Sequence, residues 1–125
     1  MYLTRAEQTL RLFYDAMEQN PFGFSHMLGA LDLYLHRPKE IVLFGDKNAP
    51  ETRAMLARIH ELFLPNKIVL CVESSEHSQQ GQYKLPSLLA GRSQVDGKLT
   101  AYVCQNFTCS LPVTDWEALR ALLME

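Results

Sequence analysis

The sequence lacks an excess of positive charge and lacks long apolar runs. Its 125 residues carry a formal net charge of −2, so no basic field attracts nucleic acid or anionic lipid, and we expect neither partner. No uncharged apolar run approaches the roughly 18 residues that a membrane-spanning helix needs. The first residues, MYLTRAEQ, lack the apolar stretch of a signal peptide. These absences predict a soluble cytoplasmic protein that does not enter a membrane.

Cysteine is scarce, and the familiar catalytic motifs are missing. Three cysteines are an odd number and do not form a disulfide scaffold, which agrees with a reducing compartment. We find no H-E-x-x-H motif, no Ser-His-Asp order and no convincing pair of carboxylates. We therefore expect a protein without catalytic activity of its own and without a cofactor.

What the sequence does contain is the composition of one globular domain, covering residues 1–125. Hydrophobic residues make up 47% of the chain and charged residues 21%, as in ordinary folded proteins. A chain of this length can bury roughly two-thirds of the surface that its unfolded form exposes. One hydrophobic core is therefore expected.

Residues 1–38 have the pattern of a helical hairpin. Thr4 with Glu7 forms a capping-box signature, and apolar residues follow on one helical face as far as Pro21. A second helix is expected from the N-cap Ser25 to about His36. Its apolar side chains cover an arc of about 220°. This second helix therefore needs cover on two sides: from the first helix, and from a sheet or an absent part of a larger protein.

Residues 39–125 read as a βαβ-type layer that ends in a helix. Two short β-branched runs, IVLFG and KIVLCVE, flank the helical pattern PETRAMLARIHELFLP, which predicts parallel strands joined by a helix that starts at Pro50. VDGK predicts a turn into a third strand, Leu99 to Gln105, and Thr114 with Glu117 predicts the cap of a last helix. A polar loop, 74–84, and a short helix, 85–91, are expected between the second and third strands. The predicted fold is α/β: a helical hairpin packed on a small three-stranded, mainly parallel sheet, in α/β/α layers.

Cys104 and Cys109 are candidate redox residues. Four intervening residues in a turn allow two thiols to approach within disulfide distance, although the spacing differs from the C-x-x-C of thioredoxin-like sites. A metal site would need further ligands, and Cys71 and His77 are the candidates. Three interpretations stay open at this point: structural cysteines, a reversible dithiol pair, or a metal site.

The ends of the predicted strands form a candidate ligand rim. FGDKNAP follows the first strand and opens a helix, where α/β proteins often hold an anion. It has one glycine rather than three, and Asp46 would repel a phosphate. A small ligand or nucleotide would meet Gly45, Asp46, Glu73 and Asn106.

Three segments together carry a family resemblance: NPFGFSHMLGALDLYL, KEIVLFG and LTAYVCQNFTCSLPVTD. They resemble the C-terminal end of a thioredoxin-domain family, the spermatogenesis-associated protein 20 family. The sharpest match is AYVCQNFTCSLP, which places the family pattern on Cys104, Cys109 and Pro112. The resemblance implies an N-terminal thioredoxin-like domain and a helical (α/α) toroid in the full-length relatives. Nothing here matches the first domain, and at most the last toroid hairpin is present.

Three functional hypotheses follow. The preferred one is a non-catalytic C-terminal module that self-associates, or binds a toroid-type helical partner, through its helical hairpin. The second is a small redox protein that uses Cys104 and Cys109. The third is a binder of small ligands or nucleotides at the strand ends.

Overall fold

The computed structural model describes residues 1–73, 89 and 91–125. The described residues form two compact units, Met1–Pro38 and Lys39–Glu125. The predicted polar loop 74–84, with His77, and all of the predicted short helix 85–91 except Leu89 and Gly91 lie outside the described residues. None of the helices in the described ranges combines the length and the apolar character that spanning a membrane requires.

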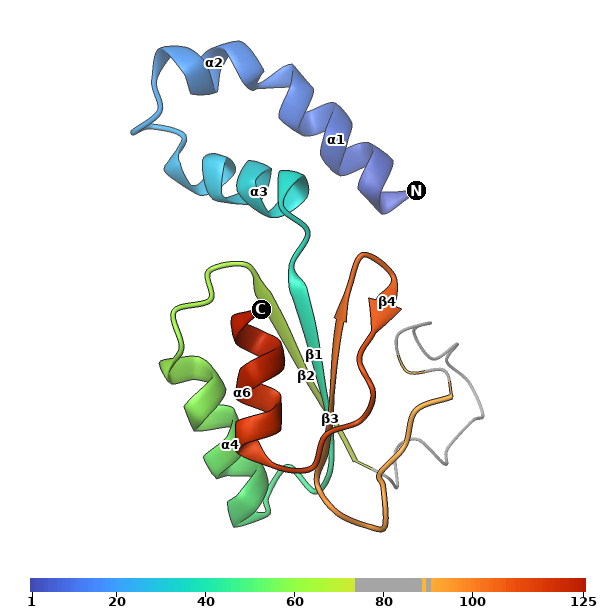
Figure 1. The fold of residues 1–125 in the computed structure, drawn as a ribbon. Helices are drawn as coiled ribbons and strands as arrows, with labels where there is room; N and C mark the ends of the chain where they lie inside the picture. The colour runs from blue at the N-terminus through green and yellow to red at the C-terminus, as the bar shows by residue number, and fades with distance from the viewer. Residues whose placement is uncertain (74–88, 90) are drawn as a thin grey trace. The chain divides into compact units, whose positions relative to one another are not determined.

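The first unit, Met1–Pro38, contains three helices: α1 (Tyr2–Leu12), α2 (Tyr14–Gln19) and α3 (Ser25–Leu35) (Figure 1). The prediction of one continuous helix as far as Pro21 is wrong, because the helix breaks at Phe13. The Phe13 ring there packs against Phe24, with 6.2 Å between the ring centroids. This contact comes from the other side of the turn, so the local apolar period does not reveal it.

Both predicted caps of the helical hairpin need correction. Helix α1 begins at Tyr2, so Thr4 lies inside the helix and forms no capping box. Phe24 rather than Ser25 is the N-cap of α3, and it caps without a side-chain hydrogen bond. The turn is held instead by Asn20, whose Oδ1 accepts a hydrogen bond from the Gly23 N–H at 3.1 Å.

The second unit, Lys39–Glu125, is built on a four-stranded sheet in the order β2-β1-β3-β4. The strands are β1 (Lys39–Phe44), β2 (Lys67–Val72), β3 (Thr100–Gln105) and β4 (Thr108–Cys109). Helix α4 (Pro50–Glu61) joins β1 to β2, which run parallel, so the predicted βαβ unit is confirmed. The α/β class is confirmed as well.

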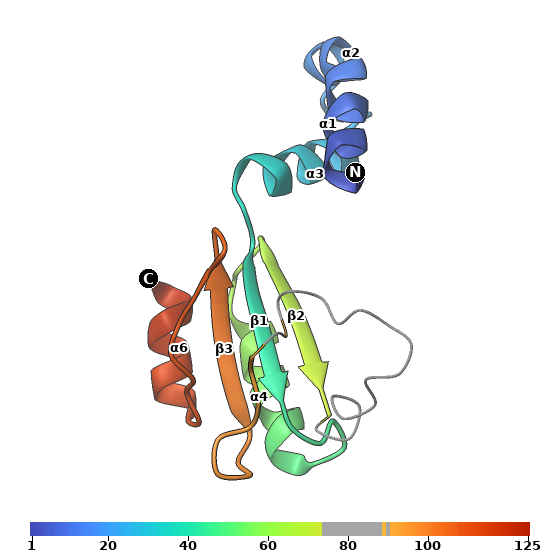
Figure 2. The same ribbon diagram turned by 90° about the vertical axis from the view of Figure 1, so that its right-hand side faces the viewer.

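The sheet departs from the prediction in strand number and direction. It has four strands rather than three, and it is mixed rather than mainly parallel, since β3 is antiparallel to β1 and β4 is antiparallel to β3. Figure 2 shows β3 pointing opposite to β1 and β2. The short β4 was missed because a two-residue turn, Asn106–Phe107, returns the chain directly. Both turn residues have positive φ, 51° and 65°. Two-residue turns of this kind usually have glycine as their second residue.

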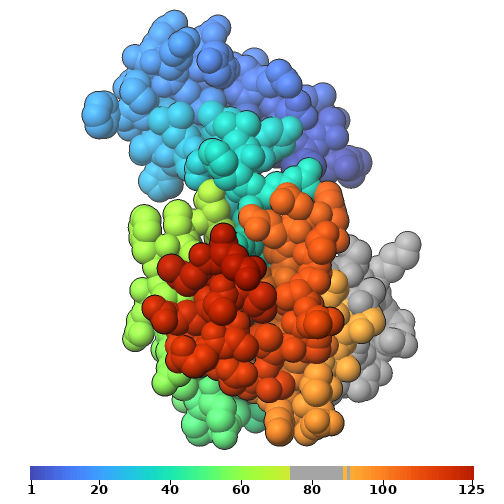
Figure 3. Space-filling model, viewed as in Figure 1, coloured from blue at the N-terminus to red at the C-terminus, as the bar shows by residue number. Residues whose placement is uncertain are grey.

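Apolar residues alternate between the two faces of the sheet, as strand geometry requires. Helices α4 and α6 (Trp116–Met124) cover one face (Figures 1 and 2). Figure 3 shows α6, in red, at the surface of this unit. The core beneath these helices contains Ile41, Leu43, Ile59, Ala101, Val103, Leu119 and Leu123. The opposite face buries a second cluster, Val42, Phe44, Val72, Leu89 and Tyr102.

The predicted start is correct for α4, whereas the predicted cap of α6 is wrong. Pro50 occupies the first turn of α4, as predicted. Helix α6 is capped by Asp115 rather than by Thr114, because Asp115 Oδ1 accepts a hydrogen bond from the Ala118 N–H at 2.9 Å. The packing of the helical hairpin on the sheet, and the single-domain organisation, stay predictions.

Candidate functional site

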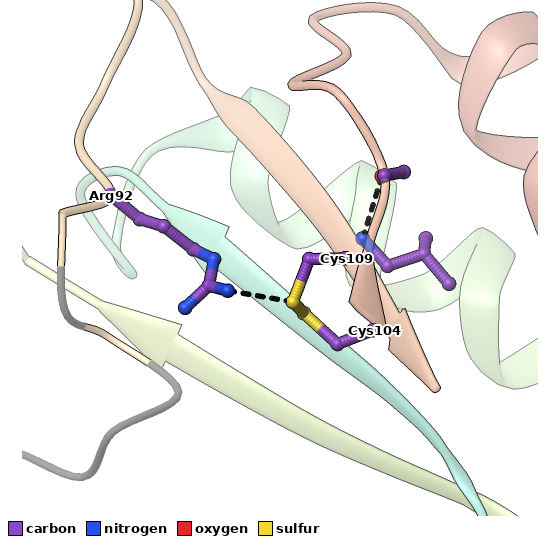
Figure 4. Close-up of a disulfide and its surroundings, with 5 residues drawn as sticks. Arg92, Cys104 and Cys109 are labelled. Atoms are coloured by element: carbon purple, nitrogen blue, oxygen red, sulfur yellow. Dashed lines mark hydrogen bonds between the residues drawn. A yellow bond between two sulfur atoms is a disulfide. The ribbon is translucent and has the colours of Figure 1, made fainter. Parts of the chain in front are cut away.

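The two candidate redox residues lie directly opposite each other in the β3–β4 hairpin and are joined by a disulfide (Figure 4). Their Cα atoms are 3.9 Å apart, closer than in most disulfides. The next pair towards the turn is Gln105 and Thr108. The structure therefore brings Cys104 and Cys109 together, as two of the three sequence interpretations require.

Hydrogen bonds on the neighbouring residues hold β4 against β3. The Ser110 N–H donates to the Val103 carbonyl at 2.8 Å, and the Val103 N–H donates to the Ser110 hydroxyl at 3.1 Å. Ser110 therefore continues the pairing for one residue beyond β4. This anchoring fixes the backbone on which Cys109 sits.

Arg92 is a third component of this site, and sequence reasoning missed it. Its Nη2 donates a hydrogen bond to Cys109 Sγ at 2.7 Å, and Figure 4 shows the guanidinium pointing at that sulfur rather than at Cys104. The guanidinium carbon also lies 5.9 Å from the centroid of the Tyr102 ring. Arg92 is 17 positions from Cys109 in the chain, so no local motif could have found it.

The segment that carries Arg92 is tied to β3. The Tyr102 hydroxyl donates to the Ser93 carbonyl at 3.0 Å. The Val95 N–H donates to the Thr100 hydroxyl at 2.9 Å, and that hydroxyl donates in turn to the Lys98 carbonyl at 2.9 Å. These three bonds hold the chain on either side of the predicted VDGK turn, and so position Arg92 next to the disulfide.

The two sulfur-bearing residues differ in their access to solvent. Cys104 is 1% exposed, whereas Cys109 is half-buried. A reagent therefore reaches the disulfide from the side of Cys109.

The metal interpretation gains no geometric support from the described residues. Cys71 lies in β2, separated from β3 by β1, and the other proposed ligand, His77, lies outside the described residues. Within the described ranges, no group of three or more histidine, cysteine, aspartate or glutamate side chains is placed to hold a metal ion.

The predicted ligand rim is divided between the two ends of the sheet. Gly45 and Asp46 follow β1, and Glu73 follows the parallel β2, so these three lie at one end. Asn106 follows β3, which runs the other way, and it therefore lies at the opposite end. Placing Asn106 in this rim is wrong, because the rule for parallel strands does not apply to β3.

The remaining rim is occupied by its own polar contacts. Lys47 Nζ lies 3.3 Å from Glu73 Oε1, and Asp46 Oδ1 accepts a hydrogen bond from the Asn48 N–H at 2.8 Å. Gly45 packs closely against its neighbours, since a Cβ atom there would lie 2.8 Å from Leu99 Cδ1 and 3.3 Å from the Thr52 hydroxyl. These contacts account for the rim residues structurally, and ligand binding at this rim stays a prediction.

The helical hairpin carries an apolar groove, which is the second candidate site. The groove has a volume of about 810 Å³ and lies between α1 and α3; its lining includes Leu3, Ala6, Leu10, Met27, Ala30 and Leu33. All residues of the hairpin are described, and two of its hydrophobic side chains, Leu10 and Met17, are buried. Several large apolar side chains of these helices are exposed, among them Leu3, Leu12 and Leu35.

One polar contact links the two sides of the hairpin. Hydrogen bonds from Arg11, followed by one from Tyr34, lower the pKa of the Glu7 carboxyl below its ordinary value of 4.5. The same bond to Glu7 raises the pKa of the Tyr34 hydroxyl above 10.0. Arg11 Nη2 lies 2.8 Å from Glu7 Oε1. Glu7 and Tyr34 therefore connect α1 to α3.

Comparison with known proteins identifies relatives over most of the chain. Spermatogenesis-associated protein 20 from Homo sapiens is 34% identical over 114 residues, which is 91% of this chain and 14% of the human protein. The proteins of the same name from Rattus norvegicus and Mus musculus are each 32% identical over the same shares. No family model and no solved structure matches the chain.

These relatives confirm the predicted family resemblance. The chain spans about one-seventh of the length of the curated relatives that it matches, 14% in each case. In those proteins the matching region is thus one part of a much larger molecule.

Proposed function

We propose that this chain, as a relative of one segment of spermatogenesis-associated protein 20, is a non-catalytic packing module of a larger protein. Its helical hairpin binds apolar helices from the rest of that protein. The observation that carries this proposal is the groove of about 810 Å³ between α1 and α3. A cytoplasmic location belongs to the same proposal.

The hairpin needs cover to be stable. Chains below about 40 residues usually depend on disulfides, metals or association to fold, and residues 1–38 bury only Leu10 and Met17 among their hydrophobic side chains. Helix α3 has no fully buried residue. Ordering such a unit costs more conformational entropy than two buried side chains offset, so further apolar contact is required.

The groove favours a helix as its occupant. Leucine, methionine and alanine make up half of its lining residues, and they come from both α1 and α3, on the two sides of a trough. Amphipathic helices fill such troughs with residues at every third or fourth position. The source of that helix is the remainder of the relatives, since 86% of each (100 − 14) lies outside the matched segment. By the family resemblance, this remainder includes the helical toroid.

A binding experiment tests the proposal. The chain is titrated into human spermatogenesis-associated protein 20 from which the matched segment has been deleted, and the heat of binding is measured by calorimetry. We expect a complex with a negative heat-capacity change, because apolar surface is buried. Light scattering on the chain alone measures self-association. A dimer that does not bind the deleted protein would replace the proposed occupant with a second copy of this chain.

Two variants separate groove binding from general apolar adhesion. Leu33→Lys places a charge in the groove lining, where Leu33 is 39% exposed, and should abolish the complex. Leu12→Lys is the matched control, because Leu12 is 78% exposed in α1 and does not line the groove. Equal loss with both variants, or no binding by the unmodified chain in either assay, would refute the packing role.

A further inference from the structure

We propose that Cys104 and Cys109 form a thiol–disulfide exchange site, in which Cys109 is the nucleophilic cysteine, Cys104 is the resolving cysteine and Arg92 stabilises the thiolate of Cys109. The site exchanges electrons with a dithiol. This activity lies in the unit Lys39–Glu125 and does not depend on the packing role of the helical hairpin.

The exposure of the two cysteines assigns their roles. In exchange reactions the accessible sulfur is the one attacked by, or attacking, the partner. Cys109 is half-buried, whereas Cys104 is 1% exposed. An external thiol therefore reaches Cys109 first. Cys104 can react only with the sulfur beside it.

Arg92 gives Cys109 the electrostatic environment of a reactive cysteine. A neighbouring arginine favours the thiolate, which is the reactive form. The guanidinium donates to Cys109 Sγ at 2.7 Å, and the Tyr102 ring lies beneath it. The hydrogen bond from Tyr102 to Ser93 ties the adjacent backbone to β3. The charge is thus held at the sulfur that solvent reaches.

Every bond that forms in the exchange replaces a bond that breaks. A thiolate of the partner dithiol attacks Cys109 Sγ; the bond to Cys104 breaks, and its electron pair leaves with Cys104, which takes a proton from solvent. The second partner thiol, after losing its proton, attacks the partner sulfur of this mixed disulfide. The partner disulfide forms, and Cys109 leaves as a thiolate beside Arg92. Two electrons pass from the partner to the chain, and the reverse sequence oxidises the chain again.

The cysteine content of the chain agrees with a reversible rather than a permanent bond. The sequence predicts a reducing compartment, where disulfides that do form are usually transient and serve catalysis or redox sensing. A lone bond within one hairpin differs from the multiple bridges that stabilise small secreted domains.

The first test uses the unmodified chain. Excess dithiothreitol should reduce the disulfide without denaturant. Iodoacetamide is then added over a series of pH values, and peptide mass spectrometry follows each cysteine separately. We expect Cys109 to react first and to stay reactive at a lower pH than Cys71, the internal control in β2. A disulfide that survives dithiothreitol in the folded protein, or a Cys104 that reacts before Cys109, would overturn the proposal.

The second test traps the mixed disulfide. The reduced chain is treated with 5,5′-dithiobis(2-nitrobenzoic acid), and the mass of the Cys109 peptide is measured. We expect Cys104→Ser to retain a thionitrobenzoate group on Cys109. In the unmodified chain Cys104 displaces that group and restores the disulfide. A stable adduct on Cys109 in the unmodified chain would contradict the resolving role of Cys104.

Variants of Arg92 test the charge. Arg92→Gln should slow the alkylation of Cys109 at neutral pH by about threefold to tenfold and move its pH profile upward, whereas Arg92→Lys should retain most of the rate. Arg58→Gln is the matched control, because Arg58 lies over Trp116 rather than beside the disulfide. The rate at Cys71 should stay constant in all three variants. An unchanged rate at Cys109 in Arg92→Gln would remove Arg92 from the site.

Discussion

Substituting Thr100 tests the hydrogen bonds that hold the Arg92 segment to the sheet. Thr100 is the first residue of β3 and is 0% exposed. Its hydroxyl accepts from the Val95 N–H and donates to the Lys98 carbonyl, both at 2.9 Å. Thr100→Val preserves the shape of the side chain and removes both bonds. Thr100→Ser preserves both bonds and removes one methyl group.

The expected magnitudes distinguish the two variants. Each lost hydrogen bond costs about 0.5–1.5 kcal/mol, and a half-buried N–H without a partner adds to this cost. Thr100→Val should therefore lower the free energy of unfolding by about 2 kcal/mol. Thr100→Ser loses roughly 0.8 kcal/mol of apolar burial. The isosteric change is thus expected to be the more damaging of the two.

Trp116 gives an assay that reports on this unit alone. It is the single tryptophan of the chain and begins α6, within Lys39–Glu125. Its fluorescence during urea unfolding gives the free energy of unfolding for each variant. If the slope of this free energy against urea concentration is the same in all variants, the surface that becomes exposed on unfolding is unchanged.

The relative stability of the two Thr100 variants decides whether the hydroxyl has the assigned role. A Thr100→Val protein that is as stable as the unmodified chain, or more stable than Thr100→Ser, would refute the role assigned to the hydroxyl. Thr100→Val should also slow the alkylation of Cys109, because the backbone that carries Arg92 is released.

Three further predictions concern the β3–β4 hairpin and the helical hairpin. Phe107→Gly should raise the free energy of unfolding by about 0.5–1 kcal/mol, measured by Trp116 fluorescence, because φ is 65° and the ring is 92% exposed; a loss of stability would contradict this. Reducing the Cys104–Cys109 disulfide should cost up to roughly 2 kcal/mol in the same assay, since the loop that it closes is short; an unchanged midpoint would contradict it. The Glu7–Tyr34 contact should stabilise the helical hairpin in a pH window. The contribution of Glu7, whose pKa is lowered, is present above pH 4.5 and lost as pH falls through the folded-state pKa. That of Tyr34, whose pKa is raised, is present below pH 10.0 and lost as pH rises through the folded-state pKa. Circular dichroism measures the helix content of each protein as a function of pH. The unmodified chain should lose helix at both ends of the pH window, and Glu7→Gln should show neither of these two losses.

Local patterns predicted most of the elements and failed at their ends. The β-branched runs around a helical period predicted β1, α4 and β2, because alternation and period are properties of neighbouring residues. The caps at Thr4 and Thr114 were wrong, since the helices begin at Tyr2 and Trp116. Several nearby residues have suitable side chains, and the choice among them depends on how the helix packs.

The candidate redox pair was available from the sequence, but its third member was not. Cys104 and Cys109 are separated by a turn, so spacing alone suggested that they could meet. Arg92 contacts Cys109 only after the chain has crossed the predicted VDGK turn, run along β3 and returned in β4. The ligand rim failed at Asn106 for a related reason, because the direction of β3 depends on its connection and not on its residues.

The sequence by itself determined the segments that form α3, α4, α6 and β1 to β3, the parallel pairing of β1 with β2, and the membership of both cysteines in one turn region. These features depend on contacts between residues close in the chain or on the period of apolar side chains. Only the tertiary structure decided the direction of β3, the existence of β4 and the position of Arg92 beside Cys109. The direction of β3 and the position of Arg92 depend on packing between distant segments, for which a local pattern carries no information. β4 depends on a two-residue turn, Asn106–Phe107, that lacks the usual glycine.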